Sequence, residues 1–141
     1  MPKSLLPTWD DKYRIGNDMI DAQHKKLFEI ALRIEKATNE NVYQDEIKEM
    51  LTELFNYMKE HFAYEEKYMQ EISYPNLDKH KVSHRRITED MVKIVTTIKT
   101  TNDLKEKLYV VMQKWLLEHI LMEDMVIGDW HKEQLVNNMP D

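Results

Sequence analysis

The histidines are the residues of this sequence with the most chemistry to offer, because their spacing pairs them with one another and with carboxylates. His61 precedes Glu65 by four residues, His80 precedes His84 by four, and His119 is followed closely by two acidic residues. Side chains four residues apart lie on one face of a helix. Imidazole and carboxylate groups without thiolate are ligands for iron, zinc, copper, nickel or manganese. The pattern predicts a metal site of histidine and carboxylate.

The composition argues against several other kinds of chemistry. The chain has no cysteine, which removes disulfides, thiolate nucleophiles, iron–sulfur clusters and cysteine-bound zinc. Its net charge of -6 and pI near 5.5 argue against nucleic acid as a partner, because nucleic-acid binding depends on clustered Lys and Arg. The sequence has no run of ~18 to 20 apolar residues to span a membrane, and its first residues lack the apolar stretch of a signal peptide. We therefore expect a cytoplasmic protein that binds neither nucleic acid nor a membrane.

Long helices are the elements that must position the histidines. Two glycines and four prolines in 141 residues leave few positions for tight turns and argue against a fold rich in β-hairpins. Breakers and polar clusters, including the stretch from Gly128 onward, divide the chain into four long segments. Each segment carries one stripe of residues three or four positions apart. The stripes are Ile20, His24, Leu27, Ala31 and Ile34; Ile47, Leu51, Leu54, Met58, His61, Glu65 and Met69; Leu77, His80, His84, Ile87, Met91, Ile94 and Ile98; and Leu104, Leu108, Val111, Trp115, His119 and Met122.

We predict an all-α fold, an antiparallel up-down-up-down four-helix bundle, because short connections make sequential helices antiparallel neighbours. Residues 1–141 form a single domain with an extended N-terminal arm over about residues 1–16. Asn17 is expected to cap the first helix, and Asn102 or Thr101 the fourth.

Such a bundle brings five of the six histidines to one level, because late positions on even helices and early positions on odd helices meet at the same end. A single histidine on an apolar face is more often a hydrogen-bonded core residue than a ligand. Five together, without metal, would be buried titratable groups lacking evident partners, at ~1 to 3 kcal/mol each. Five also exceed the needs of one ion, so we predict two metal ions. His131 fits no stripe and is expected at the surface.

The same residues carry a resemblance to a known family. His24 lies in the run from Ile20 to Phe28, and three further motifs follow in order: H-x3-E from His61, H-x3-H from His80, and H-x4-D from His119. This series closely resembles the hemerythrin family in its bacterial form, over roughly residues 9–124. The resemblance implies a non-haem di-iron site that binds O2, with two iron ions (Fe2+/Fe3+) and an oxo or hydroxo bridge.

The resemblance also assigns the ligands. His80, His84 and His119 would hold one iron, His24 and His61 the other, and Glu65 and Asp124 would bridge both. One position would stay open for O2 on the two-histidine iron. The apolar residues expected to exclude water from bound O2 are Leu27, Phe62, Trp115, Leu116 and Ile120, for which ordinary core packing is the alternative.

The second bridging carboxylate stays open on helical geometry alone. Glu123 is four residues after His119 and shares its face, whereas Asp124, at five residues, is rotated by about 140°. The spacing in the family favours Asp124.

The leading function is reversible O2 binding by a carrier, store or delivery protein and not by an enzyme, with O2 as ligand and docking to an oxygen-consuming client. Five neutral imidazoles favour the ferrous state, whereas ferritin-like sites that activate O2 contain more carboxylates. The alternatives are a di-iron enzyme that reduces peroxide or nitric oxide, a hydrolase that uses two metals as Lewis acids, and an oxygen or iron sensor.

Overall fold

The computed structural model describes residues 6–40, 44–97 and 99–137, without the side chains of Gln44, Thr101, Asn102, Lys114 and Trp115. Three regular helices come first: α1 (Asp18–Asn39), α2 (Gln44–Glu71) and α3 (Leu77–Thr97). The fourth helical run comprises α4 (Thr101–Val110), the π-helical segments η2 (Val111–Leu117) and η3 (Ile120–Asp124), and α5 (Met125–Asn137). A 3-10 turn, η1 (Asp11–Tyr13), precedes α1, and the described residues contain no strand.

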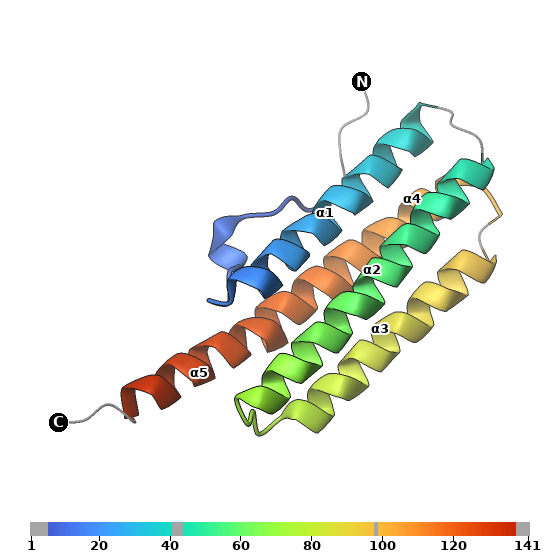
Figure 1. Ribbon diagram of the computed structural model, residues 1–141. Helices are drawn as coiled ribbons and strands as arrows, with labels where there is room; N and C mark the ends of the chain where they lie inside the picture. Colours follow the sequence, from blue (N-terminus) through green and yellow to red (C-terminus); the bar gives the residue numbers. More distant parts are fainter. Residues whose placement is uncertain (1–5, 41–43, 98, 138–141) are drawn as a thin grey trace.

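These elements form the predicted all-α bundle. α1 packs against α2, α2 against α3, and the fourth helical run lies against both α1 and α3 (Figure 1). Each helix runs antiparallel to the one before it, and α5 continues past the end of the bundle. The up-down-up-down arrangement is confirmed.

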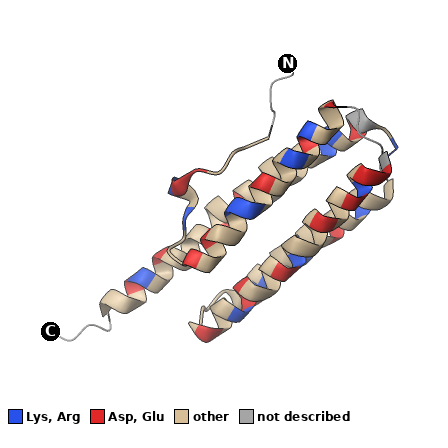
Figure 2. Ribbon diagram, turned by 45° about the horizontal axis from the view of Figure 1, so that its top comes forward, with Lys and Arg blue, Asp and Glu red and all other residues tan. Residues whose placement is uncertain are grey.

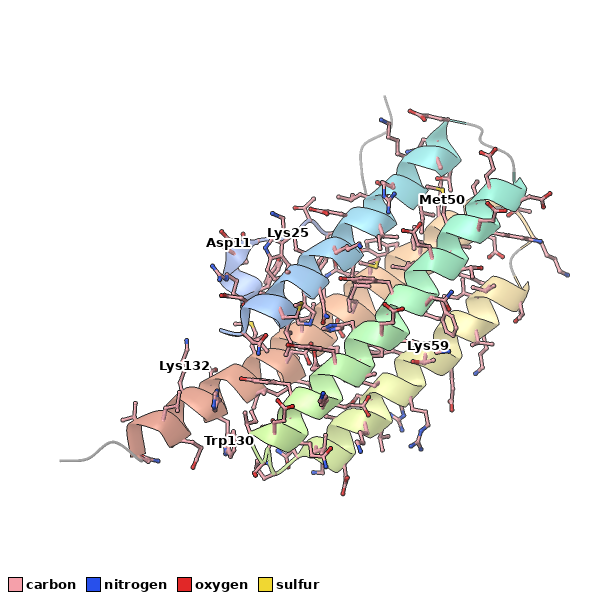
Figure 3. The ribbon with its side chains drawn as sticks, in the orientation of Figure 1. Asp11, Lys25, Met50, Lys59, Trp130 and Lys132 are labelled. Atoms are coloured by element: carbon pink, nitrogen blue, oxygen red, sulfur yellow. The ribbon has the colours of Figure 1, made fainter. Side chains whose placement is uncertain are left out.

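The surface mixes charges of both signs. Lys and Arg alternate with Asp and Glu along the helices, without one sign gathering on a single helix (Figure 2). Side chains such as that of Lys132 on α5 point away from the bundle (Figure 3). Among the described residues, no helix combines the length and the apolar character that crossing a membrane requires.

The predicted stripes of the first three helices face the core. Every predicted residue of α1 and α2 is buried, including the histidines and Glu65. In α3 the stripe is buried from His80 to Ile94, Leu77 is half-buried, and Ile98 lies outside the described residues. Regular α-helices repeat every 3.6 residues, which explains why spacing alone identified these faces.

The fourth stripe is wrong at its end. Leu104, Leu108, Val111 and His119 are buried as predicted, but Met122 is 73% exposed. A π-helix bonds each N–H to the carbonyl five residues back, so each residue turns the chain less than in an α-helix. Steps of three or four residues therefore no longer follow one face within η3, where Met122 lies.

The predicted end of the fourth helical run at Gly128 is wrong, because Gly128 lies inside α5. A Cβ at this position would lie 2.1 Å from the carbonyl oxygen of Ile15, so the helix can approach the N-terminal segment only with glycine there. The other glycine, Gly16, has a φ of 97° and turns the chain into α1.

The helix caps agree in part with prediction. Asn17 caps α1 as expected, because its side chain accepts a hydrogen bond from the N–H of Ile20 at 3.0 Å. The prediction for the fourth helix is wrong, because the cap is Thr100, whose hydroxyl accepts from the N–H of Asp103. The cap therefore lies one residue before Thr101 and two before Asn102, the two candidates from the sequence.

Candidate metal centre

All four helical elements contribute to one buried cluster of polar side chains. The cluster contains the seven predicted metal ligands, each at most 5% exposed: His24 on α1, His61 and Glu65 on α2, His80 and His84 on α3, and His119 and Asp124 in the fourth helical run. Buried charged groups are rare in protein cores unless they are paired or bind metal.

Three histidines form the larger group around the carboxylates. Nε2 of His80 lies 2.8 Å from Oε1 of Glu65 and 2.8 Å from Oδ1 of Asp124. Nε2 of His84 lies 3.1 Å from the same Glu65 oxygen, and Nε2 of His119 lies 3.1 Å from the same Asp124 oxygen. One ligand atom from each of these five residues lies within 4.8 Å of all the others, which is close enough to surround one metal ion.

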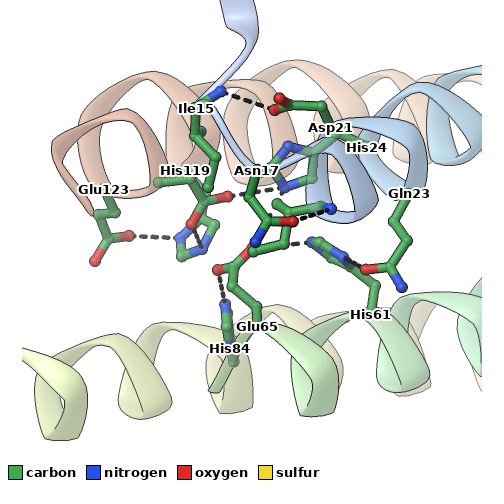
Figure 4. Close-up of polar contacts among 12 residues, drawn as sticks. Ile15, Asn17, Asp21, Gln23, His24, His61, Glu65, His84, His119 and Glu123 are labelled. Carbon is green, nitrogen blue, oxygen red and sulfur yellow. Dashed lines mark hydrogen bonds and ion pairs between the residues drawn. The ribbon is translucent and has the colours of Figure 1, made fainter. Parts of the chain in front are cut away.

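Two histidines form the smaller group on the other side. Nε2 of His24 lies 3.4 Å from Oε2 of Glu65 and 3.2 Å from Oδ2 of Asp124. Nε2 of His61 lies 3.0 Å from Oε2 of Glu65. Glu65 and Asp124 therefore each turn one oxygen toward the larger group and the other toward the smaller group, and the labelled rings lie around Glu65 in Figure 4. In this arrangement each carboxylate could bind one metal ion with each of its two oxygens.

The π-helical geometry explains how Asp124, and not Glu123, reaches the cluster. The N–H of Met125 donates to the carbonyl of Ile120, five residues back. In such a turn a residue five positions after His119 comes round to the same side of the helix. Asp124 is fully buried among the histidine Nε2 atoms, whereas Glu123 is partly exposed and contacts the outer Nδ1 of His119 and the hydroxyl of Ser83.

The outer Nδ1 atoms of three histidines have partners that the sequence analysis did not identify as such. Glu123 contacts His119, Glu66 contacts His84, and Gln23 contacts His61. The sequence suggests Glu123 as a ligand, but its position four residues after His119 also suits a side-chain hydrogen bond on one helix. Glu66 and Gln23 reach across to other helices, so no local spacing could have identified them.

The cluster shifts the pKa values of its members in opposite directions. Burial disfavours protonation of His24 and His80, but the carboxylates of Asp124 and Glu65 outweigh burial and raise the pKa of each to about 9. The pKa of His119 is likewise raised well above its ordinary value, against burial and mainly by Asp124. Burial alone would raise the pKa of Glu65, but the close imidazoles of His24, His61, His80 and His84 hold it well below its ordinary range.

His61 is the exception among these histidines. Burial lowers its pKa, and the favourable contacts with Glu65 do not compensate. Without metal, His24, His80 and His119 therefore favour protonated imidazole, whereas His61 favours the neutral form that a metal ligand requires.

Several polar atoms in the cluster have no hydrogen-bond partner among the described residues. They are Nδ1 and Nε2 of His24, Nε2 of His61, Nε2 of His119, Oε2 of Glu65 and both carboxylate oxygens of Asp124. Such buried atoms cost about 1 to 3 kcal/mol each when they stay unsatisfied. All but the first lie at the short contacts between the histidine Nε2 atoms and the two carboxylates. Cations bound there would satisfy them, and the nitrogen and oxygen donor set suits iron and other first-row metals.

The apolar residues expected around the site lie in the core. Leu27, Phe62, Leu116 and Ile120 belong to the main buried cluster, and the side chain of Trp115 lies outside the described residues. Phe62 stacks on the ring of His84, with centroids 3.9 Å apart and planes at 8°. Its closest aromatic contact is thus with the larger histidine group.

The N-terminal segment adds an aromatic residue that the sequence analysis missed. The ring of Trp9 lies 6.4 Å from that of His24 and 5.9 Å from that of Phe28. His131, predicted at the surface, is half-buried, and its Nδ1 lies 3.1 Å from the hydroxyl of Tyr68. It is not part of the ligand cluster.

Comparison with known proteins agrees with this geometry. The family model described as Hemerythrin HHE cation binding domain matches residues 15–130, a range that includes all seven clustered residues. The chain belongs to the hemerythrin family. Its fold and its buried histidine and carboxylate cluster are therefore those of a cation-binding domain of this family.

Relatives from several bacteria are similar over most of their length. A bacteriohemerythrin of Campylobacter jejuni is 34% identical over 129 residues, which cover 90% of this chain and 97% of the relative. One from Clostridium acetobutylicum is 34% identical over 122 residues, covering 82% and 94%. One from Pseudomonas aeruginosa is 30% identical over 120 residues, covering 82% and 75%.

Proposed function

We propose that this hemerythrin-family protein binds O2 reversibly at a di-iron centre, as a carrier, store or delivery protein and not as an enzyme. The main support is the way Glu65 and Asp124 divide their oxygens between a group of three histidines and a group of two. A carboxylate with one oxygen toward each histidine group can bind two ions side by side. Two adjacent ions are what O2 binding at a di-iron centre requires.

Each residue of the cluster has a distinct part in the proposed centre. One ion would be held by three histidines and the other by two, with Glu65 and Asp124 shared; the three are His80, His84 and His119, and the two are His24 and His61. Two iron ions joined by an oxo or hydroxo bridge would supply the electrons needed to bind O2 reversibly.

The unequal histidine groups favour one side for the exogenous ligand. His24 and His61 provide one imidazole fewer than the larger group, so an ion held there would keep one more coordination position for a small molecule. The ring of Trp9 packs near His24, and the core residues Leu27 and Leu116 are fully buried. We expect these apolar side chains to keep water and protons away from bound O2, which would slow its loss as hydroperoxide and the oxidation of both irons.

The donor set supports a carrier over an enzyme. Five imidazoles and two carboxylates bring less negative charge to two ions than the carboxylate-rich sites of ferritin-like proteins. Less negative charge favours ferrous iron, the form that binds and releases O2. The relatives' name, bacteriohemerythrin, supports the same proposal.

The experiment is O2 binding by the reduced, iron-loaded protein. We expect about one O2 for each pair of irons, a new visible absorption band on binding, and recovery of the reduced spectrum under vacuum. Azide should compete with O2. His84→Ala should lose iron and O2 binding, whereas His131→Ala, a change outside the ligand cluster, should retain both.

A different result would favour the alternatives. A reduced protein that rapidly consumes peroxide or nitric oxide and never returns O2 would contradict the carrier proposal and support the enzyme. Iron loss of equal size in His84→Ala and His131→Ala would contradict the assignment of the ligands.

A further inference from the structure

The outer Nδ1 atoms of the clustered histidines have different partners in the two groups. In the larger group, Nδ1 of His119 lies 2.6 Å from Oε2 of Glu123. Nδ1 of His84 lies 3.3 Å from a carboxylate oxygen of Glu66. In the smaller group, Nδ1 of His61 lies 2.7 Å from the side-chain oxygen of Gln23. Carboxylates thus support the larger group and a neutral amide supports the smaller one, as the dashed contacts to Glu123 and Gln23 show in Figure 4.

His24 extends this contrast. Its Nδ1 is buried and has no hydrogen-bond partner among residues 6–40, 44–97 and 99–137. The smaller group therefore has one histidine oriented by an amide and one whose outer nitrogen lacks support from the described side chains.

Glu123 is the most firmly held of these partners. Its Oε2 accepts from His119, and its Oε1 accepts a hydrogen bond of 2.7 Å from the hydroxyl of Ser83 on α3. A nitrogen-to-oxygen distance of 2.6 Å is at the short end for a bond to an ionised carboxylate. The contact between Glu66 and His84 is longer and therefore weaker.

The charge of the partner matters to a metal-binding imidazole. A carboxylate that accepts the Nδ1 proton leaves Nε2 free for the metal, fixes the ring orientation and makes Nε2 a stronger donor. An amide oxygen selects the same tautomer but adds no negative charge. His119, and to a smaller extent His84, should therefore bind a cation more strongly than His61.

We propose that Glu123 is a positioning residue that makes the His80, His84 and His119 position the tighter of two metal positions. This position fills first and empties last. Gln23 keeps the other position weaker because it supports His61 without charge. The inference rests on the two-metal centre proposed above, and the extra histidine of the larger group acts in the same direction. The test must therefore separate the effect of Glu123 from the number of ligands.

The experiment is titration of the metal-free protein with Co2+ under anaerobic conditions, followed by calorimetry and visible absorption, and repeated with Fe2+. The wild type should bind two ions in two resolved events. Glu123→Gln keeps the size of the side chain and removes its charge, so the tighter event should weaken about 10- to 100-fold. The weaker event should change little.

Two further variants on the same side provide controls. Ser83→Ala removes the hydrogen bond that holds Glu123 and should weaken the same event by a smaller factor. Glu118→Gln changes an exposed carboxylate in the same helical run and should leave both events unchanged. Far-UV circular dichroism on each variant distinguishes loss of binding from loss of fold.

The reciprocal variant tests charge directly. Gln23→Glu places a carboxylate against His61, so it should strengthen the weaker event by up to about 10-fold and narrow the gap between the two. A general loss of stability could not produce this gain.

The outcomes separate this inference from the function on which it rests. If two ions bind to the wild type but Glu123→Gln weakens both events equally, or neither, the role of Glu123 is overturned and the two-metal centre stands. If the wild type binds fewer than two ions, the proposed function itself is contradicted.

Discussion

α2 and the fourth helical run each supply one histidine and one carboxylate to the buried cluster, but they do so with different spacing. On α2, Glu65 follows His61 by four residues, which is the repeat of a regular α-helix. In the fourth run, Asp124 follows His119 by five residues, and π-helical segments bring the two side chains together. A local change in helix type therefore does in one element what ordinary periodicity does in the other.

This difference shows where a functional helix departs from regular geometry. π-Helical turns are rare and occur frequently at functional sites. Here η3 ends at Asp124, the residue that the two histidine groups share with Glu65. The irregular helical segment thus lies at the second carboxylate that contacts both histidine groups.

The largest expected effect is a difference in bound iron when each of the two neighbouring acidic residues of the fourth run is replaced by alanine. Asp124→Ala should reduce bound iron from two ions to one or none and abolish the spectrum of the iron pair, because Asp124 contacts both histidine groups. Glu123→Ala should still bind two ions at saturating metal, because Glu123 contacts the outer Nδ1 of His119 and not its Nε2. Metal analysis and absorption spectra of both variants give the answer. The opposite pattern would show that the regular i+4 spacing governs both helices.

Two methionines test whether the buried face shifts in the π-helical part of the fourth run. Met58 on α2 is 1% exposed, and Met58→Ala should lower the free energy of unfolding by about 2 to 5 kcal/mol. Met122 occupies an expected core position of the fourth run but is 73% exposed, so Met122→Ala should change stability by less than about 0.5 kcal/mol. Urea unfolding of both variants measures the difference. A comparable loss in both would mean that the fourth run keeps the regular stripe.

The glycine in the fourth run is a further contrast, since α2 contains none. Gly128→Ala adds a Cβ that would lie 2.1 Å from the backbone oxygen of Ile15, and the N-terminal segment must move away. The expected loss is about 1 to 3 kcal/mol, which exceeds the gain in helix propensity from alanine. Val126→Ala, at an exposed position of α5, is the matched control and should have little effect. Equal stability of the two variants would contradict the close approach at Gly128.

The smallest expected effect is a difference in pKa between His119 in the fourth run and His61 on α2 in the metal-free protein. The pKa of His119 is raised well above 6.5, so this histidine should stay protonated at pH 7, whereas burial lowers the pKa of His61 and leaves it neutral. By linkage, the stability that His119 contributes is fully present below pH about 6.5 and is lost as pH rises through its raised pKa. His61 acts oppositely, lowering stability as pH falls below about 6.5.

Proton NMR of the two imidazole rings measures both titrations. His61→Gln and His119→Gln assign the signals, and the pH dependence of unfolding tests the two signs. Identical titration of His61 and His119 would contradict the different surroundings that the two helices provide.

Prediction from sequence succeeded on the regular helix α2 and succeeded less well on the π-helical fourth run. The buried face of α2 could be predicted from Ile47 to Met69 because a regular helix repeats at a constant angle. In the fourth run the assumption of a regular helix failed at Met122, which is exposed. The same assumption left the choice between Glu123 and Asp124 open. The spacing of the family favoured Asp124, and the structure supplies the physical reason in η3.

Other features depended on contacts between distant segments. Gln23 and Glu66 meet histidines of neighbouring helices, and Trp9 meets His24 from the N-terminal segment. Gly128 resembles a helix breaker in the sequence and is instead a point of close packing. Such contacts arise from tertiary packing, which local spacing does not encode.

The central claim is that Glu65 and Asp124 are shared by two metal ions, and anomalous diffraction from crystals of the iron-loaded protein tests it most directly. The account predicts two iron peaks about 3.5 to 4 Å apart, each contacted by one oxygen of Glu65 and one oxygen of Asp124. The three-histidine peak should retain higher occupancy when iron is limiting. A single iron peak, or two peaks with neither carboxylate between them, would contradict the account.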